Sequence, residues 1–165
     1  MKNMKVVFFY VLISIHLLAC AQPKSVIRKV YATFIEHIPG NIPADREGNE
    51  IPLRDTVIMV YVETTSFRIH WNHAWLNGKT YSIISSMGDS NYIDAGIRRD
   101  NNMKITITGS ASAKLWRLQL VPGEKNVAVP LKAGRGEIIL SATYLHQKIT
   151  RRINSMIEVV GPPTP

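Results

Sequence analysis

Apolar runs of strand length follow one another along most of the chain. The run Val57–Val62 is continuously apolar, which is typical of a central strand that is buried on both faces. In Met103–Thr108, isoleucines alternate with polar residues, as in a strand with one exposed face. No segment keeps a helical period over three turns. The pattern therefore predicts an all-β protein.

Further segments rich in β-branched and aromatic residues are separated by glycine, proline and asparagine, which are typical of turns. We expect strands at Val26–Ile35, Thr56–Thr64, Phe67–Leu76, Lys79–Ser85, Tyr92–Arg98 and Lys114–Val121, a short edge strand at Lys125–Pro130, and a last long hairpin of Glu137–Leu145 and Lys148–Val160. The expected fold is a single immunoglobulin-like antiparallel β-sandwich of about 7–9 strands.

The clearest turn is Asn77-Gly78, which separates two of these segments. Both residue types tolerate positive φ at the two central positions of a type I′ turn. The pair therefore predicts a tight β-hairpin, in which Gly78 occupies a position that is strained for other residues.

The first twenty residues have a different pattern. Lys2 and Lys5 precede a short apolar run that ends at Leu18, and the only cysteine of the chain follows in Leu17-Leu18-Ala19-Cys20. A positive start, an apolar stretch and small residues at the end are the parts of a secretory signal. The last four residues resemble the lipobox of bacterial lipoproteins. The resemblance implies cleavage before Cys20 and lipidation of that cysteine.

Two other interpretations of this segment are an uncleaved membrane-spanning helix and a plain secretory signal with a free cysteine. The apolar run is interrupted by Ser14 and His16, whereas a spanning helix needs roughly 20 apolar residues. We therefore expect a signal peptide at 1–19, a lipidated cysteine and tether at 20–25, a β domain at 26–160 and an extended tail at 161–165.

The residues after Cys20 bear on where such a lipoprotein is sorted. In some gram-negative bacteria, an aspartate directly after the cysteine favours retention in the inner membrane, and here Ala21 takes that place. An acidic tract, used by some bacteria for export to the surface, is also missing. The lipoprotein resemblance therefore implies an anchor in the outer membrane and a domain that faces the periplasm.

The charge of the chain is +8, and loss of Lys2 and Lys5 with the signal peptide lowers it to +6, because residues 1–19 contain no acidic residue. The basic residues are dispersed, whereas nucleic-acid-binding proteins concentrate them on one stripe. We therefore expect no nucleic-acid partner. The basic residues then form a solvated surface, and the alternative is that they attract an anionic lipid or polysaccharide.

Motifs for catalysis are missing from the sequence. His70 and His73 would point to opposite faces of a strand unless it bulges, so they do not predict a metal site. The turns around Asp89 and Asp100 lack the spacing of a calcium loop. There is neither a Gly-x-Ser-x-Gly motif nor a phosphate loop. We expect no enzyme activity, no metal and no cofactor, and the second alternative is a small hydrolase or metal-dependent enzyme.

Aromatic residues offer the remaining candidates for a binding site. Trp71 shares one parity with Ile69 and Trp75, which predicts that it packs in the core. Trp75, Trp116 and Tyr81 could instead form an exposed platform for sugar rings. The sequence thus predicts a membrane-anchored, non-enzymatic domain that binds or assembles with another envelope protein, and the alternative is a carbohydrate-binding module.

Overall fold

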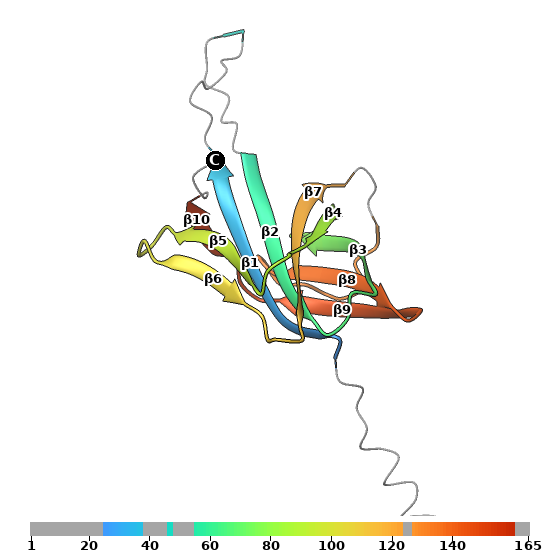
Figure 1. The fold of residues 1–165 in the computed structure, drawn as a ribbon. Coiled ribbons are helices and arrows are strands. Elements are labelled where there is room, and N and C mark those ends of the chain that lie inside the picture. The colour runs from blue at the N-terminus through green and yellow to red at the C-terminus, as the bar shows by residue number, and fades with distance from the viewer. Residues whose placement is uncertain (1–24, 38–45, 48–54, 124–126, 161–165) are drawn as a thin grey trace, which may run out of the picture.

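A computed structural model describes residues 25–37, 46–47, 55–123 and 127–160 of the chain (Figure 1). These residues form ten strands and no helix, which confirms the all-β prediction. The strands are β1 (Ile27–His37), β2 (Asp55–Thr64), β3 (Ile69–Leu76), β4 (Lys79–Met87), β5 (Tyr92–Arg98), β6 (Lys104–Thr108), β7 (Lys114–Pro122), β8 (Ile138–Tyr144), β9 (Gln147–Ile153) and β10 (Ile157–Val160). The expected signal peptide and Cys20 lie outside the described residues.

All ten strands belong to one open sheet with the order β6-β5-β10-β1-β2-β7-β4-β3-β8-β9. Every neighbouring pair is antiparallel except β1 and β10, which run parallel. The sheet wraps around, so that β9, at one end of the order, approaches β1 without pairing with it (Figure 1). The immunoglobulin-like arrangement stays a prediction.

The main hydrophobic core lies inside this wrapped sheet. It joins alternate residues of β1, β2, β3, β7, β8 and β9, with Val60, Val62, Leu118 and Ile138 fully enclosed. Within each regular stretch of these strands one parity is directed inward, because successive side chains of a strand point to opposite faces. Burial of these side chains stabilises the fold by roughly 1.5–3 kcal/mol for each large aliphatic residue.

A smaller second core covers the other face of β2 and β7. Here Tyr61 of β2 and Leu115 of β7 pack against Ile93, Ala95 and Ile107 of the β5–β6 hairpin. Burial raises the pKa of the Tyr61 hydroxyl. With both of its faces covered, β2 is the buried central strand that its continuous apolar run predicts.

The turn at Asn77-Gly78 is confirmed, since φ is +50° at Asn77 and +78° at Gly78. Two other predictions of detail are wrong. Val127–Pro130 is not a strand, and the second arm of the last hairpin is divided: β9 ends at Ile153, and β10 crosses over to pair with β1. The division at residues 154–156 raises the number of strands to ten, above the expected 7–9.

A β-bulge lies in β3, between Trp71 and His73. The bulge adds one residue relative to β8, so the parity of the side chains reverses across it. Ile69 and Trp71 face the main core before the bulge, whereas Ala74 and Leu76 face it afterwards. Trp75 therefore lies on the opposite face from Trp71, although the sequence places the two on one parity.

Candidate functional site

The strand β4 is paired along only part of its length on one side. Its ladder with β3 joins Lys79–Ser82 to residues of the second half of β3 and then stops. Its ladder with β7 continues to Met87. Within the described chain, the segment Ile83–Met87 therefore has a neighbour on one side and a free edge on the other.

The hydrogen-bond phase of the β4–β7 ladder identifies the backbone groups at this free edge. The Gly88 N–H donates to the Leu115 carbonyl oxygen (2.8 Å). In an antiparallel ladder such paired residues alternate, so Ser86 and Ile84 also direct their backbone groups toward β7. Ser85 and Met87 direct theirs to the free edge, where an added strand would find two N–H donors and two carbonyl acceptors.

The side chains of Ile83–Met87 carry no charge, and Ile84 is 61% exposed and Met87 46% exposed. The two terminal strands of the sheet are different. The strand β6 carries Lys104, and β9 carries Arg151 and Arg152. Charged residues on edge strands oppose pairing with another chain, and an uncharged apolar edge permits it. The β4 edge is therefore the place where this sheet can accept a further strand.

A hollow of about 330 Å³ lies beside the end of this edge. Its walls come from the end of β4, the following connection, the start of β5 and the outer face of β7, and they comprise Ser86, Met87, Gly88, Asp89, Ser90, Tyr92, Ile93 and Arg117. The Tyr92 side chain is 60% exposed at its rim. Because Arg117 of β7 is part of its wall, the hollow lies at the end of β4 on the side that faces β7 and β5.

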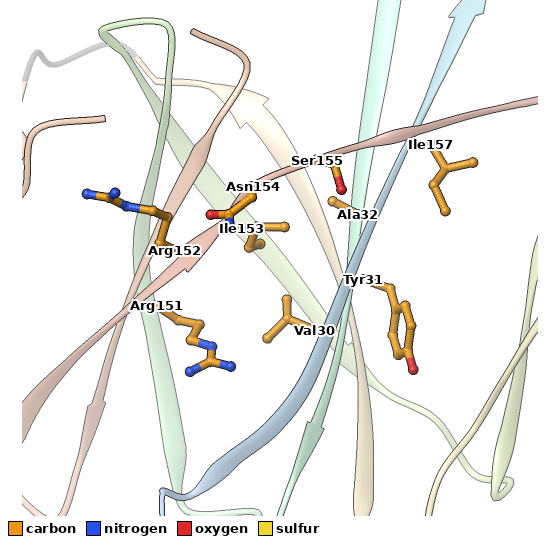
Figure 2. Close-up of a pocket in the computed structure, with 9 residues that line it drawn as sticks. All are labelled: Val30, Tyr31, Ala32, Arg151, Arg152, Ile153, Asn154, Ser155 and Ile157. Carbon is orange, nitrogen blue, oxygen red and sulfur yellow. The ribbon is translucent and has the colours of Figure 1, made fainter. Parts of the chain in front are cut away.

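A second hollow, of about 190 Å³, lies where β9 approaches β1 (Figure 2). Arg151 pairs in register with Leu140, a main-core residue, so its side chain starts on the inner face of the sheet. An arginine that faces inward on a terminal strand opposes closure of the ladder between β9 and β1. This hollow is small for a ligand pocket, and we interpret it as the gap that Arg151 keeps open.

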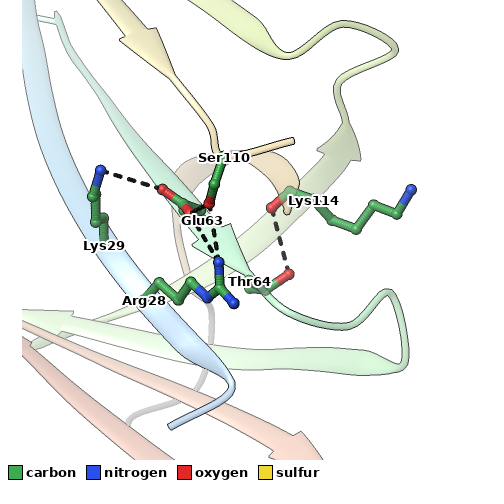
Figure 3. Close-up of polar contacts among 6 residues, drawn as sticks. All are labelled: Arg28, Lys29, Glu63, Thr64, Ser110 and Lys114. Atoms are coloured by element: carbon green, nitrogen blue, oxygen red, sulfur yellow. Dashed lines mark hydrogen bonds and ion pairs between the residues drawn. The ribbon is translucent and has the colours of Figure 1, made fainter. Parts of the chain in front are cut away.

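The buried carboxylate of Glu63 contacts side chains from several elements at the end of the sheet where β1 begins (Figure 3). The Glu63 side chain is 2% exposed, and it accepts a hydrogen bond from the Ser110 hydroxyl. Arg28 Nη1 lies 3.9 Å from Glu63 Oε1, and Lys29 Nζ lies 3.7 Å from Oε2. The Glu63 carboxylate thereby links β1, β2 and the β6–β7 connection.

The aromatic candidates for a sugar platform are dispersed. Trp75 is 2% exposed, and its indole N–H donates to the Val127 carbonyl oxygen (2.9 Å). Trp116 is half-buried, donates to Thr64 Oγ1 and packs edge-on against Trp71 at 6.0 Å between ring centroids. Tyr81 packs against the main core. An enclosed ring such as that of Trp75 has no face on which a sugar could stack.

The bulge in β3 brings His70 and His73 to the same outer face, because the parity reverses between them. No group of three or more His, Cys, Asp or Glu side chains within the described ranges is placed to hold a metal ion. Away from the histidines, Asp94 has a lowered carboxyl pKa. The Lys104 ammonium donates a hydrogen bond to this carboxylate (2.8 Å), the Gly96 N–H donates another, and both stabilise its charged form. That pair is exposed and holds the β5–β6 hairpin together.

No protein-family model matches the sequence, and neither the curated proteins nor the solved structures compared with it contain a match. In the part of the chain that the structure describes, no helix is long and apolar enough to cross a membrane. The function must therefore be argued from the chain itself.

Sequence reasoning missed the β4 edge. The segment Lys79–Ser85 predicts a strand, and the polar pair Ser85-Ser86 indicates exposure of its end. Which strand lies beside it is a matter of tertiary pairing, however, and the bulge that diverts β3 has no recognisable pattern in His70–Ala74.

Proposed function

We propose that this protein is a membrane-anchored, non-enzymatic envelope lipoprotein, whose β domain binds an extended segment of another envelope protein at the β4 edge. The anchor rests on the lipobox resemblance at Cys20. The binding mode rests on one observation: Ile84–Met87 is uncharged, exposed and paired on one side only. In such strand addition, main-chain bonds provide affinity and side-chain pockets provide specificity.

The immunoglobulin-like description of the domain belongs to the same proposal. Antiparallel pairing throughout most of the sheet and a main core enclosed by the wrapped sheet support it. The parallel pairing of β1 with β10 and the continuity of the sheet depart from a sandwich of two separate antiparallel sheets. Addition of a partner strand at β4 would lengthen the existing sheet without rearranging either core.

The energy of main-chain pairing alone indicates how the partner must bind. Four hydrogen bonds, to the N–H and C=O groups of Ser85 and Met87, contribute about 2–6 kcal/mol. That range corresponds to affinities no better than tens of micromolar. A tighter partner must also contact the exposed side chains of this edge, Ile84 and Met87. We therefore expect an extended segment with an apolar residue that packs against them.

The test is site-specific photo-crosslinking of the full-length protein in its native envelope. A photo-reactive amino acid at Ile84 should capture one partner, and the same group at Met103, an equally exposed residue beside the β5–β6 turn, should not. Ser85→Pro should abolish the crosslink, because proline cannot donate a hydrogen bond to the added strand. Thermal unfolding should be almost unchanged, since the Ser85 N–H does not bond to β7.

A matched variant separates loss of binding from loss of fold. Ile84→Pro removes a donor to β7, so it should lower the unfolding temperature as well as the crosslink. The mapped site in the partner must be an extended segment. A crosslink that survives Ser85→Pro, or one that joins two copies of this chain, would overturn the proposal of a partner strand at this edge.

A further inference from the structure

The position at which β1 begins defines one end of the domain, which we call the anchor end. Ile27 pairs with Thr64 at the end of β2, and Thr64 pairs with Lys114 at the start of β7. The connections β2–β3 (65–68) and β6–β7 (109–113) and the β8–β9 turn (145–146) lie at this end (Figure 1). The Asn77-Gly78 turn and the β5–β6 turn lie at the opposite end.

The proposed lipid at Cys20 would hold the anchor end close to a bilayer. Even when fully extended, the chain from Cys20 to Val26 spans only about 20 Å. The surface that the anchor end presents therefore faces lipid headgroups at short range. This step rests on the anchor of the proposed function, and the test below is arranged so that the two can fail separately.

Two large apolar side chains are exposed in the connections between strands at the anchor end. Phe67, in the β2–β3 connection, is 61% exposed, and the Arg68 guanidinium lies 5.8 Å from the centre of its ring. Leu145, at the tip of the β8–β9 hairpin, is 59% exposed. An aromatic ring beside a guanidinium suits the boundary between headgroups and acyl chains.

The backbone at Leu145 gives an independent reason to consider this tip functional. Leu145 has φ +47° and His146 has φ +65°, the left-handed conformation that Asn-Gly adopts at low cost. The same chain uses Asn77-Gly78 for its turn at the opposite end. A leucine in this conformation is strained, and such strain is typical of positions whose side chain is retained for function.

The charge of the anchor end is also suited to a lipid surface. Its exposed cationic side chains are those of Arg28, Lys29, Arg68, Lys114 and Lys148. Against them stand the exposed Asp89 and the buried Glu63, whose carboxylate pairs with Arg28 and Lys29, so the described residues of this end still carry an excess of positive charge. Basic residues next to an anionic bilayer are attracted to its surface, and the attraction falls off within a Debye length.

We propose that the anchor end docks directly on anionic phospholipid, with Leu145 and Phe67 inserted at the headgroup boundary and the surrounding lysines and arginines on the headgroups. The docking fixes the orientation of the domain on the membrane. The β4 edge then faces along the surface rather than into it.

The test uses the full-length lipidated protein in vesicles, with single cysteines that carry a polarity-sensitive fluorophore. Acylation of Cys20 leaves no other thiol in the chain. Labels at Leu145→Cys and Phe67→Cys should be quenched by a quencher attached to the acyl chains. Met103→Cys, from an equally exposed residue at the opposite end, should not be quenched. The difference should be several-fold in phosphatidylethanolamine–phosphatidylglycerol vesicles and should decrease in phosphatidylcholine or at high salt.

Two variants test the mechanism. Replacement of Leu145-His146 by Asn-Gly should raise the unfolding temperature by a few degrees, because the strain is removed. It should also reduce quenching of the label at Phe67→Cys. Arg68→Glu combined with Lys114→Glu should reduce the quenching too, whereas Lys79→Glu at the opposite end should not.

Flotation of the protein with the vesicles separates the two proposals. If the protein floats but no label is quenched, or all three labels are quenched equally, the docking proposal is wrong and the anchor stands. If it does not float, the anchor is wrong and the docking with it. A response at Leu145→Cys that requires another envelope protein would assign this surface to a protein partner and overturn the lipid assignment.

Discussion

At the scale of single residues, the bulge at Asn72 decides what the tryptophans do. Without it, Trp71 and Trp75 would share a face, as their spacing predicts. With it, Trp71 packs half-buried against the main core, whereas Trp75 is enclosed on the other face and bonded to Val127. The more important structural tryptophan is therefore Trp75, which the sequence left as a candidate for binding.

Trp75→Ala should lower the free energy of unfolding by about 3–5 kcal/mol, because it removes a fully buried ring and leaves a cavity. Trp71→Ala should cost less, since its ring is partly exposed and its indole N–H has no hydrogen-bond partner in the described structure. Chemical denaturation followed by circular dichroism measures both. A smaller loss for Trp75→Ala than for Trp71→Ala would contradict the assignment.

At the scale of elements, two tight β-hairpins of the same chain place different residues at the positive-φ positions of their turns. The β3–β4 turn uses Asn77-Gly78, and the β8–β9 turn uses Leu145-His146, all at positive φ. The first choice is the one that backbone sterics favour. The Leu145-His146 turn has a higher conformational energy, because both residues carry side chains at positive φ. A contact of the exposed leucine outside the domain explains why it is there.

Gly78→Ala should destabilise the protein by about 1–2 kcal/mol, because alanine is strained at φ +78° even though nothing lies within 4 Å of the added methyl group. Gly88→Ala is the matched control: its added methyl group would make only ordinary contacts, at 3.5 Å from Ile93 Cδ1, without a positive φ. It should be nearly neutral. Thermal unfolding of the pair checks the prediction, which equal effects would contradict.

At the scale of the whole molecule, one sheet serves two cores. The strands β2 and β7 carry the main core on one face and the β5–β6 hairpin on the other. A central layer covered on both sides leaves few places where a partner could add a strand. Of these, β9 has its inward Arg151 and β6 has Lys104, so the free half of β4 remains.

Cys20→Ser tests the attachment of this molecule to the membrane. The variant should stay unprocessed or become soluble, whereas the wild-type protein should partition into detergent. Several acyl chains at about 0.8 kcal/mol per buried CH₂ bind far more firmly than the marginal hold of one. Phase separation followed by mass spectrometry measures the outcome. Wild-type protein in the aqueous phase with a free Cys20 would contradict the anchor.

The sequence by itself determined the class of structure and most of its elements. The continuous apolar run of β2, the alternation in β6 and the Asn77-Gly78 turn are local patterns, and local sterics and side-chain parity are enough to interpret them. Only the tertiary structure decided the bulge in β3, the division of β9 from β10 and the pairing that leaves Ile83–Met87 free. Each depends on which strand lies beside which, and hydrogen bonds between distant segments fix that choice without leaving a periodic trace in either segment.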